Sequence, residues 1–343
     1  MLAEIQRFGS EVKSQMGTHV LCEDVAFKGL AIAILNGANF VAVSDPGAAK
    51  SELVLNSWRL IEEAYEPGGH LNLVGKADTT PGQLVGGRMT TKHSEKGKGR
   101  DIEYETVTSI ESVVNPSNVA IAFDEINLGD PGTTQSLNSV VENRRLSVDG
   151  HDIALPRLQY FGAIMNRRTR GDGFDMPERM ASRLTMGLHM GDNPNAAMFD
   201  RVQRVVGISN PSRVSDPSTI KPVTNLEHLA AMRSYVRRVQ PVEKMLEYSS
   251  LSAVVMSDAM RAERNLQRED PGRIGMQIIR GAQAIACLEN EEGTITKQAI
   301  DMATRYTLLA RLLVRSTKEY DEVEAFVAET MGKIEFEARQ FRV

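Results

Sequence analysis

The chain has little of what marks secreted, membrane-spanning or strongly basic proteins. Its 343 residues include two cysteines, Cys22 and Cys287, in no metal-ligand spacing, which is typical of a reducing compartment. The longest apolar runs, such as 30–35, are far too short to cross a membrane, and the first residues lack a signal-peptide core. A formal net charge of −5 provides no overall basic field for nucleic acid. We therefore expect a globular, cytoplasmic protein with no membrane contact.

The most informative segment is 44–51, Ser-Asp-Pro-Gly-Ala-Ala-Lys-Ser, which follows an apolar run. It is close to the phosphate-loop (Walker A) pattern G-x-x-x-x-G-K-[ST], in which backbone N–H groups cradle phosphates. Lys50 would reach the β- and γ-phosphates of ATP, and the Ser51 hydroxyl would hold Mg²⁺. Ser44 and Ala49 replace the two glycines, so this segment alone also allows a turn that binds nothing. The residues expected to contact the nucleotide are Asp45, Pro46, Gly47, Ala48, Ala49, Lys50, Ser51 and Glu52.

A second motif argues against the interpretation of residues 44–51 as a turn that binds nothing. Residues 118–125, Asn-Val-Ala-Ile-Ala-Phe-Asp-Glu, form an apolar run that ends in two adjacent carboxylates, as in a Walker B strand. Asp124 would bind Mg²⁺ directly or through water, and Glu125 would polarise the water that attacks the γ-phosphate. An isolated Asp-Glu pair is usually a solvated strand end, but here it follows a Lys-Ser loop.

The order of segments predicts two structural units. In residues 1–210, short apolar strands alternate with helical segments, which indicates an α/β domain with a mainly parallel sheet. Two hairpins are inserted in it, at about 84–106 and 146–154. A Pro-, Ser- and Thr-rich linker at 211–224 precedes an all-helical lid domain at 225–343.

Individual elements are expected from apolar spacing and from cap residues. Helices are predicted at 2–14, 30–35, 52–65, 132–144, 224–239, 242–264, 275–289, 296–315 and 321–340, strands at 39–43, 70–74 and 160–165, and a turn at 270–273.

These pieces occur in the order of an AAA+ ATPase, and the chain resembles the MoxR family over roughly residues 20–315. The resemblance rests on 36–47, Asp124-Glu125-Ile126-Asn127, 141–150 with Leu155-Pro156, 160–166, Pro177-Glu178 with Ser182-Arg183-Leu184, and Arg273 with 280–284.

The resemblance implies further catalytic residues. Asn166 resembles sensor 1, whose amide would hold the lytic water with Glu125. Arg183 resembles the arginine finger, which would act on the nucleotide of the neighbouring subunit, with Arg179 as the alternative. Arg273 resembles sensor 2, which would reach the γ-phosphate from the lid and couple hydrolysis to lid rotation. Each arginine could instead be a surface residue in a salt bridge.

The resemblance also implies a ring, most commonly a hexamer, that remodels or metal-loads a partner protein, chaperone-like, with a von Willebrand factor A-type partner. The two hairpins would contact the client. The first carries a basic set: Arg88, Lys92, Lys96, Lys98 and Arg100. Ser44 and Ser182 depart from the family's glycine and aspartate, which suggests slow turnover or a diverged branch.

Two other classes stay open. A nucleotide-gated scaffold that binds ATP but hydrolyses little would fit Ser44 and Ser182. A nucleic-acid-acting ring of a defence system would fit the basic residues at 92–100, although the net acidity counts against it. Metal-chelatase motors differ from the leading interpretation only in their partner. ATP is favoured over GTP because no Asn-Lys-x-Asp motif occurs.

Overall fold

The structure, a computed structural model, does not describe every residue. The described residues are 1–20, 24–44, 49–76, 88–96, 103–111, 114–129, 135, 137–148, 151–166, 176–189, 216–262, 269–290, 292–315 and 320–341. Four of the predicted nucleotide-binding residues, Asp45, Pro46, Gly47 and Ala48, lie outside them, as do Cys22 and residues 211–215 of the predicted linker. In the described part of the chain, no helix combines the length and hydrophobicity that a membrane crossing requires.

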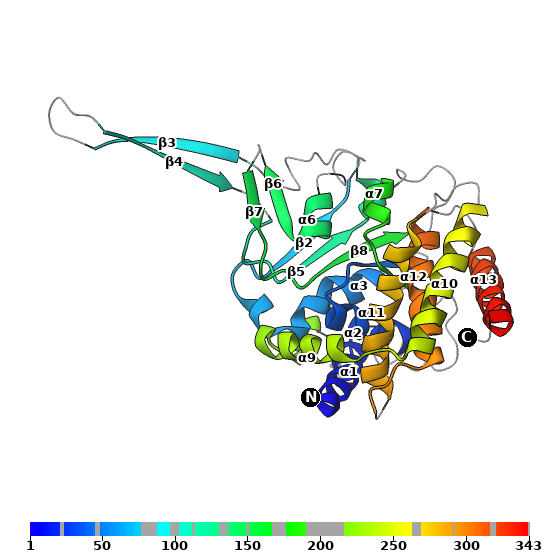
Figure 1. The fold of residues 1–343 in the computed structure, drawn as a ribbon. Helices are drawn as coiled ribbons and strands as arrows, with labels where there is room; N and C mark the ends of the chain where they lie inside the picture. The colour runs from blue at the N-terminus through cyan, green and yellow to red at the C-terminus, as the bar shows by residue number, and fades with distance from the viewer. Residues whose placement is uncertain are drawn as a thin grey trace.

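A five-stranded parallel sheet with the order β2-β5-β8-β1-β9 forms the centre of the first unit (Figure 1). Its strands are β1 (Phe40–Ser44), β2 (His70–Val74), β5 (Ala120–Asp124), β8 (Tyr160–Asn166) and β9 (Met186–His189). The middle strands are nearly all apolar and buried, as expected when helices cover both faces of a parallel sheet. The predicted parallel α/β sheet is confirmed. All strands end on one side, here called the carboxyl end, and begin on the other, the amino end.

The helix predicted at 52–65 was wrong in length. The α-helices among the described residues of the first unit are α1 (Leu2–Gly17), α2 (Asp24–Asn36), α3 (Lys50–Asn56), α6 (Asn138–Asn143) and α7 (Glu178–Ala181). After α3 the chain forms two short 3₁₀ turns, because Ile61 is extended and pairs with Thr224. The Glu62 N–H donates to Thr224 O at 2.9 Å, so pairing with the linker overrides local helix propensity.

Both predicted hairpins are present. β3 (Arg88–Lys96) pairs with β4 (Glu103–Glu111), and β6 (Arg145–Val148) pairs with β7 (His151–Ala154). The β3–β4 ribbon projects far from the sheet (Figure 1). Its register places Arg88 opposite Glu111 and Lys96 opposite Glu103. A basic residue therefore faces an acidic one at each end of the paired region, and Lys98 and Arg100 lie outside the described residues.

Among the described residues after the linker there are five helices: α9 (Leu226–Arg238), α10 (Glu243–Ala262), α11 (Pro271–Glu289), α12 (Lys297–Arg315) and α13 (Tyr320–Phe341). The turn predicted at 270–273 was wrong, because α11 begins at Pro271. The Asp270 carboxylate accepts the Gly272 N–H at 3.1 Å, and proline is suited to a first helical position. Arg273 consequently lies in the first turn of α11.

The start of α11 is held by a buried ion pair. Arg311 of α12 is fully buried, and its Nε and Nη2 donate to Glu269 Oε2 at 2.9 and 2.8 Å. Glu269 immediately precedes the Asp270 cap. Since a buried guanidinium requires such a partner, this contact fixes α12 to the end of α11 that carries Arg273.

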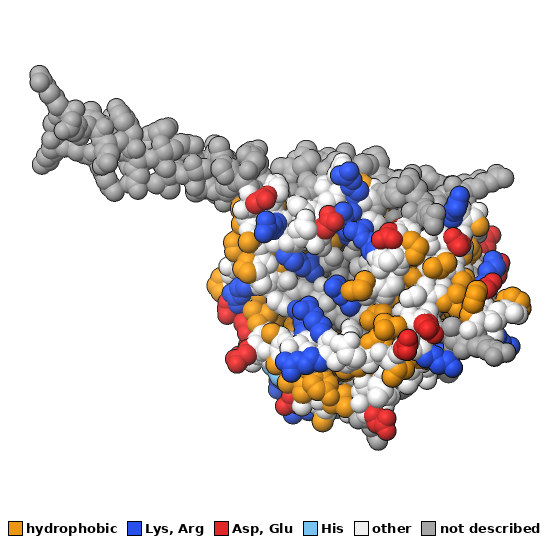
Figure 2. Space-filling view, viewed as in Figure 1, with side chains coloured by type: hydrophobic (Ala, Val, Ile, Leu, Met, Phe, Trp, Pro, Cys, Tyr) orange, Lys and Arg blue, Asp and Glu red, His pale blue; other side chains and the backbone are white. Residues whose placement is uncertain are grey.

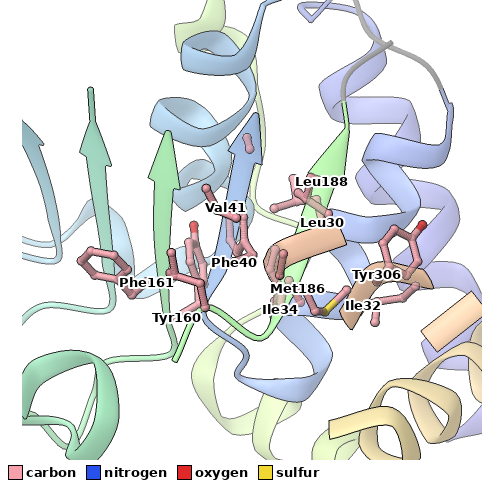
Figure 3. Packing of buried hydrophobic residues seen from close by; sticks show 14 of the residues in the cluster. Leu30, Ile32, Ile34, Phe40, Val41, Tyr160, Phe161, Met186, Leu188 and Tyr306 are labelled. Atoms are coloured by element: carbon pink, nitrogen blue, oxygen red, sulfur yellow. The ribbon is translucent and has the colours of Figure 1, made fainter. Parts of the chain in front are cut away.

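The helical unit packs directly on the edge strand β9. A Cβ added to Gly187 would lie 2.4 Å from the Ala310 backbone nitrogen of α12, so only glycine permits this approach. Met186 and Leu188 of β9, Tyr306 of α12 and the apolar face of α2 belong to one hydrophobic core (Figure 3). The two units therefore share a core, and the start of α11 comes close to the amino end of the sheet.

Candidate active site

Four of the predicted site residues meet at the carboxyl end of the sheet. Asp124 ends β5, Asn166 ends β8, and Lys50 begins the helix that follows β1. These strands are neighbours, and the register pairs Ser44 with Asn166. Glu125 directly follows Asp124. Parallel strands place such residues at one edge, where ligands of open α/β sheets bind.

The backbone before Lys50 has the conformation that the phosphate-loop pattern normally assigns to glycine. Ala49 has φ 57° and ψ 21°, in the left-handed region. Lys50 is only 5% exposed at the start of α3. Ala49 therefore replaces the glycine of the phosphate-loop pattern but keeps its backbone conformation, at a conformational cost of about 1 kcal/mol.

Ala49→Gly is expected to stabilise the protein. Glycine adopts positive φ without a Cβ clash, so the free energy of unfolding should rise by up to about 1 kcal/mol, and nucleotide affinity should not fall. Thermal unfolding with and without ATP measures both. A lower melting temperature for Ala49→Gly would contradict the strain assigned to this residue.

The two carboxylates at the end of β5 have different environments. The Asp124 side chain accepts the Glu125 N–H at 2.9 Å, and its backbone carbonyl accepts the Gly75 N–H at 2.8 Å. Glu125 has φ 51°, a strained conformation for glutamate. A Cβ added to Gly75 would lie 2.3 Å from the Glu125 carbonyl oxygen. Gly75 therefore holds the Glu125 backbone from the neighbouring strand, a role that sequence analysis missed although Gly75 directly follows a predicted strand.

Gly75→Ala is expected to lower ATP turnover at least tenfold, since the added methyl group must displace the Glu125 backbone and small misplacements of a catalytic group are costly. Nucleotide binding should change little, because Lys50 belongs to another element. Turnover and ATP affinity, measured on the same preparation, separate the two effects. Undiminished turnover would show that Gly75 does not position Glu125.

The donor set at this end fits a magnesium–nucleotide complex. Ser51 lies in the first turn of α3 and Asp124 ends β5. Over the described ranges, no group of three or more His, Cys, Asp or Glu side chains gathers that could hold a metal alone. Mg²⁺ needs no such cage, since it commonly takes one or two protein oxygens together with substrate phosphates and water.

The predicted arginines lie at the opposite, amino end of the sheet. Arg183 precedes β9, and its backbone carbonyl accepts a hydrogen bond of 3.3 Å from Asn39, which precedes β1. Arg183 Nη2 contacts Glu142 Oε2 at 2.6 Å, and Arg273 Nη2 lies 3.6 Å from Glu142 Oε1. The prediction that Arg273 reaches the γ-phosphate from the lid stays a prediction, and in this arrangement the packing of α12 on β9 places the start of α11, with Arg273, at the amino end.

These residues line a cavity of about 410 Å³ between the sheet and the helical unit. Its charged lining consists of Glu142, Arg144, Arg183, Arg273 and Arg280. Several Lys and Arg side chains are also visible on this face of the molecule (Figure 2). The excess of guanidinium groups suits an anionic ligand.

Arg183 has a carboxylate partner even though Ser182 departs from the family pattern. Ser182 stands where the family has an aspartate that could orient Arg183, and the Arg183 guanidinium here contacts the carboxylate of Glu142, on α6, at 2.6 Å. The Ser182 hydroxyl instead donates to Arg179 O at 3.0 Å. Glu142 lies in the segment 141–150 that carried the resemblance, yet nothing in the sequence showed that α6 would face α7.

Two partly buried arginines support the wall of this cavity. Arg144 Nη2 donates to Gly37 O at 3.0 Å, and Arg233 Nε donates to Ile34 O at 3.1 Å, so both cap the end of α2. Burial lowers the pKa of Arg144 to about 10. Burial and the neighbouring charge of Arg144 lower that of Arg233 to about 9. Sequence analysis did not single out either residue.

Comparisons with known proteins agree with this architecture. Residues 41–184 match the family model described as AAA domain (dynein-related subfamily). The chain is 24% identical over 219 residues, 63% of its length, to the uncharacterized protein YeaC of Bacillus subtilis (strain 168), and this match spans 65% of that relative. The crystal structure of a candidate ATPase from Cytophaga hutchinsonii ATCC 33406 covers 97% of this chain and 95% of its own, with a TM-score of 0.65 and 14% identity. The fold is an AAA+ nucleotide-binding core with a helical lid.

Proposed function

We propose that this chain is a Mg²⁺-dependent ATPase of MoxR type whose active site is completed by a second copy of the chain. The observation that carries the proposal is the separation of the two groups of predicted residues. Arg183 is tied to the beginning of β1 through Asn39, whereas the phosphate loop follows its end. Five strand residues span about 16 Å, so Arg183 acts on the nucleotide of a neighbour.

The residues at the carboxyl end divide the chemistry among them. Lys50 and the backbone at the start of α3 hold the β- and γ-phosphates, since a helix N-terminus favours anions. Glu125 takes the proton of the attacking water, which the Asn166 amide orients. Mg²⁺, held by Ser51 and Asp124, would neutralise charge on the phosphates.

The amino end supplies the remaining charge stabilisation. In a ring, the arginine cavity of one copy faces the phosphate loop of the next, and Arg183 and Arg273 bind phosphate oxygens there. Arginine suits this role because its guanidinium stays charged and forms paired hydrogen bonds. A closed ring repeats one such heterologous interface, and the expected ring is a hexamer.

The work performed is the remodelling or metal loading of a partner protein, with a von Willebrand factor A-type protein as the expected partner. The projecting β3–β4 ribbon supports a contact outside the core. Because an acidic residue faces a basic one at each end of its paired region, the ribbon favours a protein client over nucleic acid.

A nucleotide-gated scaffold remains the second candidate, and one contact favours it. Arg183 is bound by Glu142 of its own chain, so an isolated copy holds its arginine finger away from any neighbour. Such a protein would bind ATP and assemble while hydrolysing little.

ATP turnover measured against protein concentration tests the proposal. Specific activity should rise with concentration and then level off, because a shared site exists only in assembled copies. A specific activity that is measurable and independent of concentration down to nanomolar protein would contradict a shared site. Binding of ATP with turnover near background at every concentration would favour the scaffold.

A further inference from the structure

One carboxylate links the two arginines that come from different units of the chain. We propose that Glu142 is a counter-ion that holds Arg183 and Arg273 on their own chain, and that the phosphates of a neighbour's nucleotide replace it during assembly. This inference rests on the proposed function, since it concerns the same arginines. It adds a residue that sets how readily copies associate.

Arg183 is occupied by its own chain on both terminal nitrogens. Nη2 contacts Glu142 Oε2 at 2.6 Å, while Nη1 donates to Arg179 O and lies 3.4 Å from the Ser182 hydroxyl. Its Nε is buried and has no hydrogen-bond partner within the described ranges. The side chain is only 15% exposed. Arg183 must therefore exchange a partner before it can bind a phosphate.

Arg273 shares the same carboxylate through its other oxygen. Its Nη2 lies 3.6 Å from Glu142 Oε1, and its side chain is 45% exposed. Arg273 belongs to α11 of the helical unit, whereas Glu142 belongs to α6 of the α/β unit. The single carboxylate thus fixes the arginines of both units relative to each other.

Carboxylate and phosphate compete for the same guanidinium donors. Both accept paired charge-assisted hydrogen bonds from arginine, and a phosphate group carries the larger charge. Among the described charged residues of the cavity, Glu142 is the one carboxylate beside four arginines. A triphosphate that enters can therefore displace Glu142, while the remaining arginines keep the cavity positive.

The same argument predicts the effect of neutralising Glu142. A glutamine retains the shape of the side chain but loses the charge. Its interaction with Arg183 and Arg273 is therefore weaker, and less interaction energy is lost when phosphate replaces it. Each partly exposed ion pair is modest in strength. The protein concentration that gives half-maximal specific activity should fall by roughly fivefold, with the plateau turnover unchanged.

The experiment compares wild type, Glu142→Gln and Glu142→Asp, which keeps the charge and should shift the midpoint less. Glu247→Gln, which removes an exposed charge in the second turn of α10, controls for net charge. Sedimentation with ATP, in a Glu125→Gln background that should not hydrolyse it, measures assembly independently of turnover. Thermal unfolding verifies that each variant is folded.

The outcomes separate this inference from the proposed function. A lower midpoint in both assays, with no shift for Glu247→Gln, supports the competing role. An unchanged midpoint for Glu142→Gln overturns the inference, because Glu142 would then have no effect on assembly. A plateau turnover of Glu142→Gln as low as that of Arg183→Ala also overturns it, because Glu142 would then position Arg183 for catalysis. In either case, a wild-type turnover that rises with protein concentration still supports an active site shared between copies. A wild-type turnover that is independent of protein concentration, together with a fully active Arg183→Ala, contradicts the shared site itself.

Discussion

Glu125→Gln is expected to lower ATP turnover by about a hundredfold or more while ATP binding is retained. Glutamine keeps the size of the side chain and its hydrogen bonding but cannot accept a proton from water, and general base catalysis typically contributes a factor of about 10²–10⁴. The backbone should be unaffected, since Gly75 packs against the Glu125 carbonyl and not its carboxylate. Steady-state turnover and equilibrium binding of ATP provide the comparison.

A matched control for this variant is Glu62→Gln, which removes an exposed carboxylate on the 3₁₀ turn η2 (Glu62–Tyr65). It should hydrolyse ATP at the wild-type rate. If Glu125→Gln does so as well, Glu125 is not the base, and the carboxyl end of the sheet would need another residue to activate water.

Arg183→Ala is expected to lower turnover by about a thousandfold in assembled protein, because arginine fingers typically contribute 10³–10⁵ to phosphoryl transfer. ATP binding by the variant itself should be unchanged, since Arg183 lies at the end of the sheet opposite Lys50. Loss of turnover without loss of ATP affinity, at saturating protein concentration, is the expected signature.

Arg179→Ala is the informative companion variant. Arg179 lies four positions earlier in the chain, on α7, and its side chain is exposed. If Arg183 is the finger, Arg179→Ala should retain most of the activity. A larger loss for Arg179→Ala than for Arg183→Ala would transfer the role to Arg179.

The sequence predicted four of the five sheet strands and the carboxyl end of the sheet because these features depend on local pattern, whereas the short edge strand β9 (Met186–His189) was not predicted. Buried parallel strands read as short apolar runs, and Asp124 and Asn166 each end one. Parallel topology then brings the strand ends together without further information. The helix predicted at 296–315 is α12, and the Thr296 hydroxyl caps it by accepting the Ala299 N–H at 3.2 Å.

The amino end was not predictable because it depends on contacts between distant segments. The position of Arg273 follows from the packing of α12 on β9, which the close approach at Gly187 allows. The pairing of Glu142 with Arg183 requires α6 and α7 to face each other. The early end of α3 likewise depends on the bridge between Ile61 and Thr224. None of these contacts has a signature in local periodicity.

The central claim is that one active site uses residues of two copies, and mixing two inactive variants tests it most directly. Glu125→Gln keeps Arg183 but lacks the base, whereas Arg183→Ala keeps the base but lacks the finger. In an equal mixture that exchanges subunits, one interface in four joins an intact base to an intact finger. Turnover should therefore recover to about a quarter of the wild-type value.

A double variant, Glu125→Gln with Arg183→Ala, mixed with either single variant creates no complete interface and should stay inactive. A mixture of the two single variants that remains as inactive as its components, although sedimentation shows that they co-assemble, would contradict the shared site.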